Sequence, residues 1–230
     1  MTAQRISVLI IEFNNQLPIS AIPKFRGAVI NMLNSKNILF HNHREEGGLR
    51  YSYPLIQYKR IHGKAAIVCV AEGTESIGEF FSNRNETVKI GNKEAPLELA
   101  HVKADKVLVQ LWESEFTYSL RKWLPFNQEN YAKFQEIEDV KGKAEFLEKI
   151  LTGNILSFAK GIGIRFDANI TGKITSIEEM GAMKYKDIPF AAFDILFKTN
   201  VSLPNYIGLG KGVSHGFGMV VRIKSNETKI

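Results

Sequence analysis

The feature that most constrains this chain is a glycine-rich segment close to its C-terminal end. Five of the eighteen glycines lie within eleven positions, and these are Gly208, Gly210, Gly212, Gly216 and Gly218. Glycine loses more backbone entropy on folding than any other residue, so this density indicates positive φ angles or a close approach to another group. Lys211, Ser214 and His215 lie between the glycines, and backbone N–H groups beside a lysine can cradle a phosphate. We therefore expect a phosphate-contacting loop that leads into a last strand at 219–223, and a flexible turn is the alternative.

The spacing of these glycines excludes the two common nucleotide-binding motifs. The dinucleotide fingerprint G-x-G-x-x-G would need a glycine where Val213 or His215 stands. The P-loop needs serine or threonine after Gly-Lys, whereas Gly212 follows Lys211. An enzyme that acts on a small nucleotide therefore remains only as a weaker alternative.

The composition is that of a soluble globular protein with a mildly basic balance. The chain has 230 residues, of which 44% are hydrophobic and 23% charged, enough for one large domain or two small ones. Its net charge of +6 suits a polyanionic partner. Cys69 is the single cysteine, which excludes a disulfide within the chain and a cysteine-based metal cluster. The sequence has neither a signal-peptide layout nor a membrane-length apolar run, so we expect a cytoplasmic protein with no membrane partner.

Hydrophobic patterning predicts alternating strands and helices in the first half. A strand at 6–13 precedes a helix that Ser20 caps and whose apolar stripe is Ile22, Phe25, Val29 and Leu33. The following elements are a hairpin of strands at 50–60 and 64–71, a helix from Gly73, and strands between 88 and 99. The order β-α-β-β-α-β predicts a ferredoxin-like domain over residues 1–104.

The second half repeats this order more loosely. We expect a charged turn at 103–105, strands at 106–112 and 116–123, a short helix capped by Asn127, a helix at 143–158, and strands at 162–170 and 190–197. A polar, turn-rich segment at 171–187 separates the strands expected at 162–170 and 190–197. The predicted fold class is therefore α+β, with tandem ferredoxin-like (RRM-like) domains at 1–104 and 105–230, each βαββαβ, and a C-terminal glycine-rich loop.

The densest candidate for catalytic chemistry is His41-Asn42-His43. If the segment is extended, both imidazoles point to the same face, where one can take a proton while the other gives one. Arg44 and Lys59 would supply positive charge for a phosphorane, with Tyr51 and Tyr53 as further candidates that position or stack on a base. Metal-free cleavage of RNA needs this set of groups.

Two other interpretations of the histidine pair remain open. The spacing His-x-His also suits a metal site, with Glu45 or Glu46 as a third ligand. Alternatively, both histidines merely end a strand at the surface.

These features together resemble a known family. Two ferredoxin-like units, a histidine shortly after the first helix, and the motif G-L-G-x-G-x-x-x-G-F-G at 208–218 are similar to the CRISPR-associated endoribonucleases of the RAMP superfamily, which mature CRISPR RNA. The run Tyr-Pro-Leu-Ile-Gln-Tyr-Lys at 53–59, which follows a histidine pair, resembles the subgroup with paired catalytic histidines.

The resemblance implies a specific activity. Such an enzyme binds CRISPR repeat RNA and cleaves precursor CRISPR RNA without metal or cofactor, by attack of a 2′-OH that leaves a 2′,3′-cyclic phosphate and a 5′-OH. His41 and His43 would be the acid–base pair in either order, and the glycine loop would hold the RNA. The further phosphate contacts expected in the RNA-binding interpretations are Lys24, Arg26, Arg44, Lys59 and Lys211. The alternative is a non-catalytic RNA-binding subunit of a CRISPR ribonucleoprotein, and other CRISPR-associated proteins or a second copy of the chain are expected as further partners.

Overall fold

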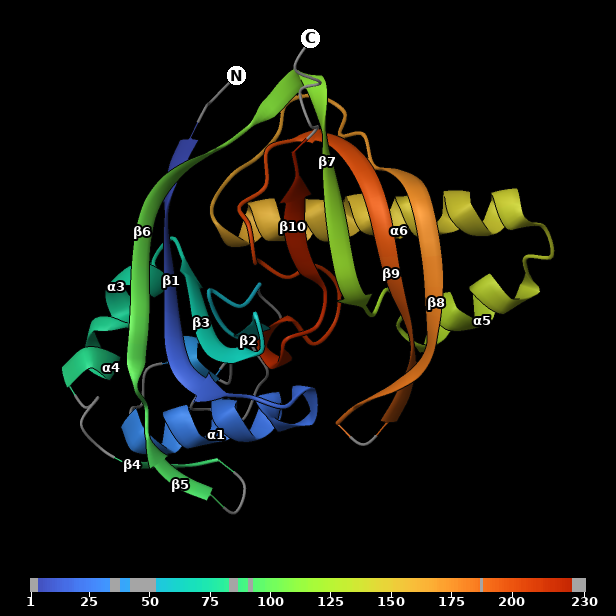
Figure 1. Ribbon diagram of the computed structural model, residues 1–230. Helices are drawn as coiled ribbons and strands as arrows, with labels where there is room; N and C mark the ends of the chain where they lie inside the picture. The colour runs from blue at the N-terminus through green and yellow to red at the C-terminus, as the bar shows by residue number, and fades with distance from the viewer. Residues whose placement is uncertain are drawn as a thin grey trace, which may run out of the picture. The chain divides into compact units, whose positions relative to one another are not determined.

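The computed structural model describes residues 4–33, 38–41, 53–82, 87–90, 93–186 and 188–224, which form two compact units (Figure 1). The N-terminal unit comprises residues 5–107 together with the short segment Ser214–Gly216. The C-terminal unit comprises 108–213 and 217–230, with residues 1–4. The division expected between 104 and 105 falls inside one long strand, β6 (Leu99–Val109).

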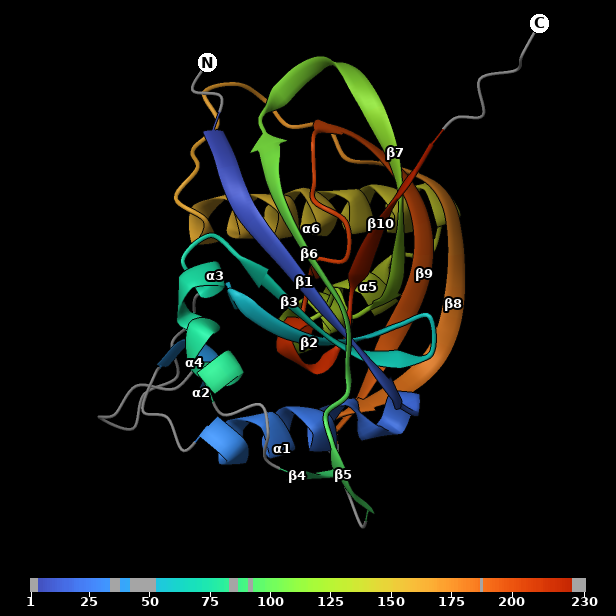
Figure 2. The ribbon, with the colours of Figure 1, turned by 60° about the vertical axis from the view of Figure 1, so that its left-hand side comes forward.

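The N-terminal unit has a four-stranded sheet in the order β2-β3-β1-β6, which is the ferredoxin-like order. Its elements are β1 (Gln4–Gln16), η1 (Ile19–Ala21), α1 (Ile22–Leu33), α2 (Ile38–His41), β2 (Ile56–Ile61), β3 (Lys64–Val70), α3 (Gly73–Ser76), α4 (Gly78–Ser82), β4 (Thr87–Ile90), β5 (Lys93–Pro96) and β6. Strands β4 and β5 form a separate two-stranded sheet. Figure 2 shows α1 beneath the hairpin of β2 and β3.

The core of the N-terminal unit lies between α1 and this sheet. The predicted stripe is confirmed, because Ile22, Phe25, Val29 and Leu33 are all buried. Phe13 of β1 packs edge-to-face against Phe25, with ring centroids 6.0 Å apart. The predicted hairpin turn is also confirmed: His62 and Gly63, between β2 and β3, both have positive φ angles of 48° and 87°.

The C-terminal unit repeats the sheet order as β10-β7-β9-β8. Its elements are β7 (Leu111–Trp123), α5 (Gln128–Glu136), α6 (Val140–Gly161), β8 (Lys173–Tyr185), β9 (Ile188–Val201) and β10 (Met219–Ile223). The 3₁₀ turn η2 (Val213–His215) lies between β9 and β10 in the chain, and its last two residues belong to the N-terminal unit. Helix α6 crosses behind the four strands in Figure 1. Asn127 caps α5 as predicted, since its Oδ1 accepts a hydrogen bond of 2.7 Å from the Asn130 N–H. The predicted tandem ferredoxin-like fold is thus confirmed, with one modification: residues 202–218 hold a single 3₁₀ turn where the second helix of the repeat was expected.

Three predictions of local structure were wrong. The charged turn at 103–105 lies within β6, and the strand expected at 162–170 is a loop after α6, in which Ile162 and Ile164 are buried. The polar segment at 171–187 contains β8, a sheet edge strand. The first six residues of β6 and nearly all of β8 are exposed. Exposed strands lack the apolar alternation that sequence patterning detects, and their main-chain pairing leaves no signature in side-chain chemistry.

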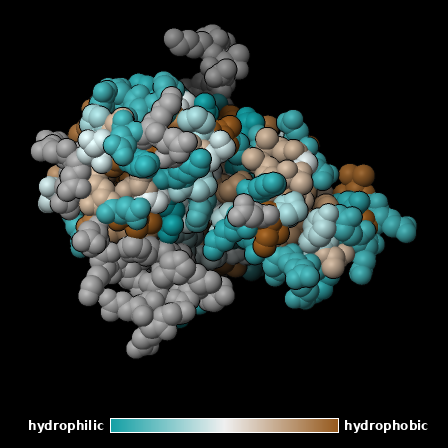
Figure 3. All heavy atoms as spheres, turned by 90° about the horizontal axis from the view of Figure 1, so that it is seen from below, coloured by the Kyte–Doolittle hydropathy of each residue, from teal (hydrophilic) through white to brown (hydrophobic). Residues whose placement is uncertain are grey.

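Both units have exposed apolar side chains among their described residues. They include Leu99 and Val102 in β6 and Ile177, Met180 and Ile188 in the β8–β9 hairpin. On the face shown in Figure 3, hydrophobic residues form separate patches among hydrophilic ones. No helix among the described residues is long and apolar enough to cross a membrane.

Candidate functional site

The glycine-rich loop has the backbone that its composition predicts. Four of its glycines have positive φ angles, and these are Gly210 (88°), Gly212 (68°), Gly216 (86°) and Gly218 (62°). A Cβ atom at Gly218 would overlap the Leu209 carbonyl oxygen, and one at Gly210 would lie 2.7 Å from the Trp123 ring. The prediction of positive φ or close approach is therefore confirmed, with both found at Gly210 and Gly218, and neither position accepts a larger residue without displacement of its neighbours.

The loop directs several of its N–H groups at the protein itself. Leu209 N–H donates to the Gly218 carbonyl (2.8 Å), and Lys211 N–H donates to the Leu124 carbonyl (3.0 Å). Gly218 N–H donates to the Lys122 carbonyl (3.1 Å). These N–H groups hold the loop in shape, so they do not form the phosphate cradle that its composition suggested.

The tip of the loop, Ser214–Gly216, packs within the N-terminal unit. A Cβ atom at Gly216 would lie 2.7 Å from Ile22 Cδ1, at the start of α1, and 3.5 Å from the Tyr58 carbonyl oxygen of β2. The Ser214 hydroxyl lies 3.1 Å from His215 Nδ1. The fold thus brings a segment near the C-terminal end against residues more than 150 positions earlier.

The candidate cation Arg26 lies next to the candidate catalytic segment. Arg26 is half-buried on α1, and its Nη2 donates a hydrogen bond of 3.5 Å to the carbonyl of Phe40, the residue before His41. Its guanidinium carbon lies 5.9 Å from the centroid of the Tyr58 ring, within range of a cation–π contact. Arg26 therefore contacts both the Phe40 carbonyl and the Tyr58 ring, and the Tyr58 carbonyl lies near the loop tip at Gly216.

The backbone at His41 differs from the sequence-based expectation. His41 is the last residue of helix α2, so the backbone is helical and not extended as far as His41. The geometric argument that an extended segment places both imidazoles on one face therefore does not hold at His41. His43, Arg44 and Tyr51 lie outside the described residues, as do the alternative metal ligands Glu45 and Glu46. Their predicted roles stay predictions.

The remaining candidates of the N-terminal unit differ in exposure. Lys24 is exposed on α1. Tyr53 is only 9% exposed, and its hydroxyl accepts a hydrogen bond of 2.8 Å from Gln57 Nε2. Lys59 is fully buried in β2 opposite Ala66 of β3, and burial lowers the pKa of its ammonium group to about 7. Near neutral pH, Lys59 is therefore deprotonated more readily than an exposed lysine.

Lys211 occupies an aromatic environment that its neighbours in the sequence do not predict. Its Nζ lies 5.5 Å from the centroid of the Phe190 ring. Lys211, Phe190 and the half-exposed Tyr131 line one cavity. The three residues come from the loop, from β9 and from α5, far apart in the chain. The sequence carries no local signal that joins them.

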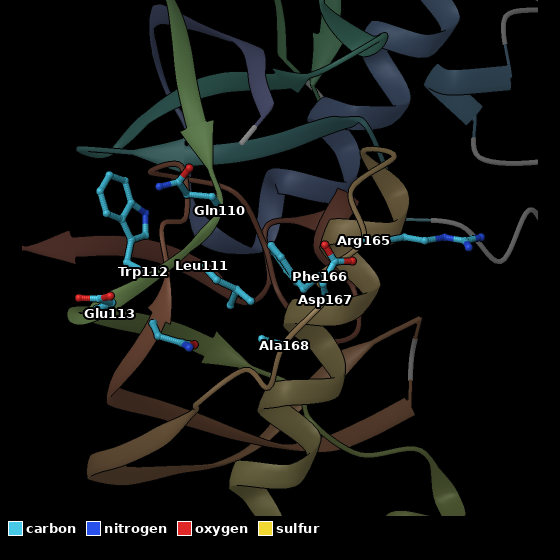
Figure 4. A pocket seen from close by; sticks show the side chains of 9 residues that line it. Gln110, Leu111, Trp112, Glu113, Arg165, Phe166, Asp167 and Ala168 are labelled. Carbon is cyan, nitrogen blue, oxygen red and sulfur yellow. The ribbon is translucent and has the colours of Figure 1, made fainter. Parts of the chain in front are cut away.

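A separate hollow of about 330 Å³ lies between the start of β7 and the loop that follows α6 (Figure 4). Trp112 and Phe166 line it, and Trp112 Nε1 donates a hydrogen bond of 2.9 Å to Ser202 Oγ. Arg165, Glu113 and Asp167 also belong to the lining, and the Arg165 side chain extends away from the other labelled side chains. Of the candidate site residues that the structure describes, none lines this hollow, and its two carboxylates outnumber the single guanidinium, which disfavours a phosphate.

Comparison with known families matches both halves of the chain to one family. Residues 4–107 match the Cas6b N-terminal domain, and residues 110–223 match the Cas6b C-terminal domain. The two matched segments follow the two structural units closely.

Individual relatives include one curated protein and two solved structures. The chain is 38% identical to an uncharacterized protein of Methanocaldococcus jannaschii over 102 residues, which are 44% of this chain and 68% of that protein. A crystal structure of Cas6b is similar with a TM-score of 0.88 and 26% identity, over 96% of this chain and 100% of the other. A second crystal structure, of the CRISPR RNA processing endoribonuclease Cas6b, has a TM-score of 0.74 at 23% identity with the same coverage, and so shows the shared fold.

Proposed function

Since the chain belongs to the Cas6b family, we propose that it is an endoribonuclease that binds CRISPR repeat RNA and cleaves precursor CRISPR RNA. A solved Cas6b relative is described as a CRISPR RNA processing endoribonuclease, which suggests the substrate. The observation that carries the proposal is the cluster of Arg26, the carbonyl before His41, and the tip of the glycine loop. In support of the proposal, the Arg26 guanidinium contacts the main chain one residue before His41, which we propose moves a proton.

The proposed chemistry needs a base, an acid and positive charge. A ribose 2′-OH attacks the adjacent phosphorus, the bond from phosphorus to the 5′-oxygen breaks, and a 2′,3′-cyclic phosphate and a 5′-OH remain. One of His41 and His43 accepts the 2′ proton and the other donates a proton to the 5′-oxygen, without a metal ion. The positive charge of the Arg26 guanidinium stabilises the extra negative charge on the phosphorane.

The test is cleavage of the cognate repeat RNA in excess chelator. Wild type is expected to cleave it, and a deoxyribose at the nucleotide 5′ of the scissile phosphate is expected to abolish cleavage because the nucleophile is missing. His41→Ala combined with His43→Ala is expected to stop cleavage while RNA binding largely persists. His101→Ala, in the exposed part of β6, is the matched control and is expected to cleave at the wild-type rate.

Three results would decide against parts of the proposal. Cleavage of the deoxy substrate would exclude the 2′-OH mechanism. Undiminished cleavage by the double histidine variant would exclude the assigned acid–base pair. RNA binding by wild type without any cleavage would instead support the non-catalytic RNA-binding subunit, with other CRISPR-associated proteins as its partners.

A further inference from the structure

A half-open cavity of about 750 Å³ lies in the C-terminal unit beside the glycine-rich loop. It is formed by the start of α5, the β8–β9 hairpin and Lys211, and its lining includes the aromatic residues Phe126, Tyr131 and Phe190. This volume lies within the range of small-molecule binding sites. We call it the aromatic cavity.

The aromatic wall of this cavity is supported from behind. The Tyr131 side chain is 45% exposed, and its ring centroid lies 5.7 Å from that of Phe126. Phe126 is buried and in turn packs against Phe134 at 4.7 Å and against Phe193 at 5.9 Å. Tyr131 therefore presents an accessible aromatic surface, and its ring packs against the buried Phe126. Such a surface suits a nucleobase, since every base has a flat π-face that stacks on aromatic rings.

Positive charge lies at one end of the aromatic cavity. Lys211 approaches the Phe190 ring, and its main chain is fixed by the hydrogen bond to Leu124. A second hollow of about 600 Å³ shares Lys211 and Asn127 with the cavity and adds the exposed Lys149 of α6. Lys211 therefore borders both hollows, and Lys149 adds a second positive charge to the second hollow, where a phosphate would be favoured. Glu179 lies in the lining of the aromatic cavity itself, which favours an uncharged base there over a phosphate.

We propose that the aromatic cavity holds one unpaired nucleotide of the bound RNA, with its base against Tyr131 and Phe190 and its phosphate beside Lys211. The proposal rests on the proposed function, because it requires that the chain binds RNA. It assigns a binding role to Tyr131 and Phe190 and gives Lys211 a defined phosphate contact between the two hollows. It makes no use of the candidate histidines, so it applies equally to a cleaving and a non-cleaving protein.

Photo-cross-linking of the wild-type protein tests the placement directly. A short single-stranded oligouridine that carries 5-iodouridine is irradiated in complex with the full chain, and the attached peptide is identified by mass spectrometry. We expect the attachment at Tyr131 or Phe190. Binding with all cross-links outside the peptides that hold Tyr131 and Phe190 would overturn this inference and leave RNA binding intact. If the wild-type chain binds neither the oligouridine nor repeat RNA, the proposed function is overturned as well.

Binding measurements with surface variants provide an independent check. Tyr131→Ala is expected to bind the oligouridine about tenfold more weakly, in line with one lost stacking contact. Tyr131→Phe keeps the ring and is expected to bind like wild type. Lys211→Ala is expected to reduce the salt slope of binding by about 0.7. Leu156→Ala, at an exposed apolar position on α6, is the control and is expected to change neither quantity. Wild-type affinity in Tyr131→Ala would overturn the stacking role.

Discussion

Arg26 donates a hydrogen bond through Nη2 to the carbonyl oxygen of Phe40, 14 residues later in the chain. The contact fastens helix α2, which ends at His41, to helix α1. The same guanidinium approaches the Tyr58 ring, and the Tyr58 carbonyl lies beside the loop tip at Gly216. Arg26 thus connects the backbone at Phe40 with Tyr58, and Tyr58 lies next to the tip of the glycine-rich loop.

The contact predicts that Arg26 affects the rate of cleavage. Arg26→Ala removes the hydrogen bond to Phe40 and the cation near Tyr58, and we expect about a tenfold lower single-turnover rate, or about 1.4 kcal/mol in the barrier. Arg26→Lys keeps the charge but loses the planar donor set, and is expected to retain part of the rate. The measurement is single-turnover cleavage of repeat RNA at saturating protein.

Lys24→Ala provides the matched control for Arg26, because Lys24 is an exposed cation on the same helix. We expect it to reduce the salt slope of RNA binding slightly and to leave the saturated cleavage rate unchanged. An equal loss of rate in both variants would show that Arg26 acts only through overall charge.

The glycine loop predicts two very different costs for the same substitution. Gly218→Ala has to accommodate a positive φ angle and an overlap with the Leu209 backbone, so we expect a loss in the free energy of unfolding of more than about 3 kcal/mol. Gly163→Ala has a similar φ of +78° but no atom within 4 Å of the new Cβ, and is expected to cost only about 1 kcal/mol. Urea unfolding of the two variants measures the difference. Equal costs would show that φ alone, and not close approach, requires glycine at position 218.

The buried Lys59 predicts a characteristic dependence of stability on pH. Its pKa is about 7 in the folded protein and 10.5 as a reference value, so between these values the unfolded chain binds one more proton than the folded one. Stability contributed by this group therefore rises with pH through that window, and the cost of Lys59 is largest below pH 7. Lys59→Met is expected to be more stable than wild type by a few kcal/mol at pH 6, with a difference that shrinks towards pH 10.

Urea unfolding at several pH values tests the role of Lys59. Lys198→Met, at an exposed position in β9, corrects for the loss of one lysine from a strand. A stability difference between Lys59→Met and wild type that stays constant from pH 6 to 10 would contradict a depressed lysine pKa.

The cap of helix α6 predicts a modest stability effect remote from the RNA chemistry. Asp139 accepts a hydrogen bond of 2.7 Å from the Gly142 N–H, and Asp139→Ala is expected to lower the free energy of unfolding by about 1 kcal/mol. Glu138→Ala changes the exposed neighbour and is expected to alter stability by less than about 0.5 kcal/mol. Cleavage by both variants should remain at the wild-type rate. A similar loss of stability in both would mean that the negative charge, and not the hydrogen bond, stabilises the helix.

Elements that depend on local chemistry were predictable from the sequence. The stripe of α1, the hairpin turn at His62 and Gly63, the Asn127 cap and the last strand all follow from residues that are near one another in the chain. Strand β8 was missed, because its exposed residues carry no apolar alternation and its pairing with β9 is made by the main chain.

By itself the sequence determined the family resemblance, the tandem order of elements and the need for glycine at 210, 212, 216 and 218, because each depends on local pattern or on backbone conformation. Only the tertiary structure decided that Arg26 contacts the carbonyl before His41, and that Lys211 lies beside Phe190 and the cavity lined by Tyr131. The physical reason is that these contacts join side chains from separate elements. Their proximity arises when the sheets pair and the core packs, and it leaves no periodicity or spacing in the chain.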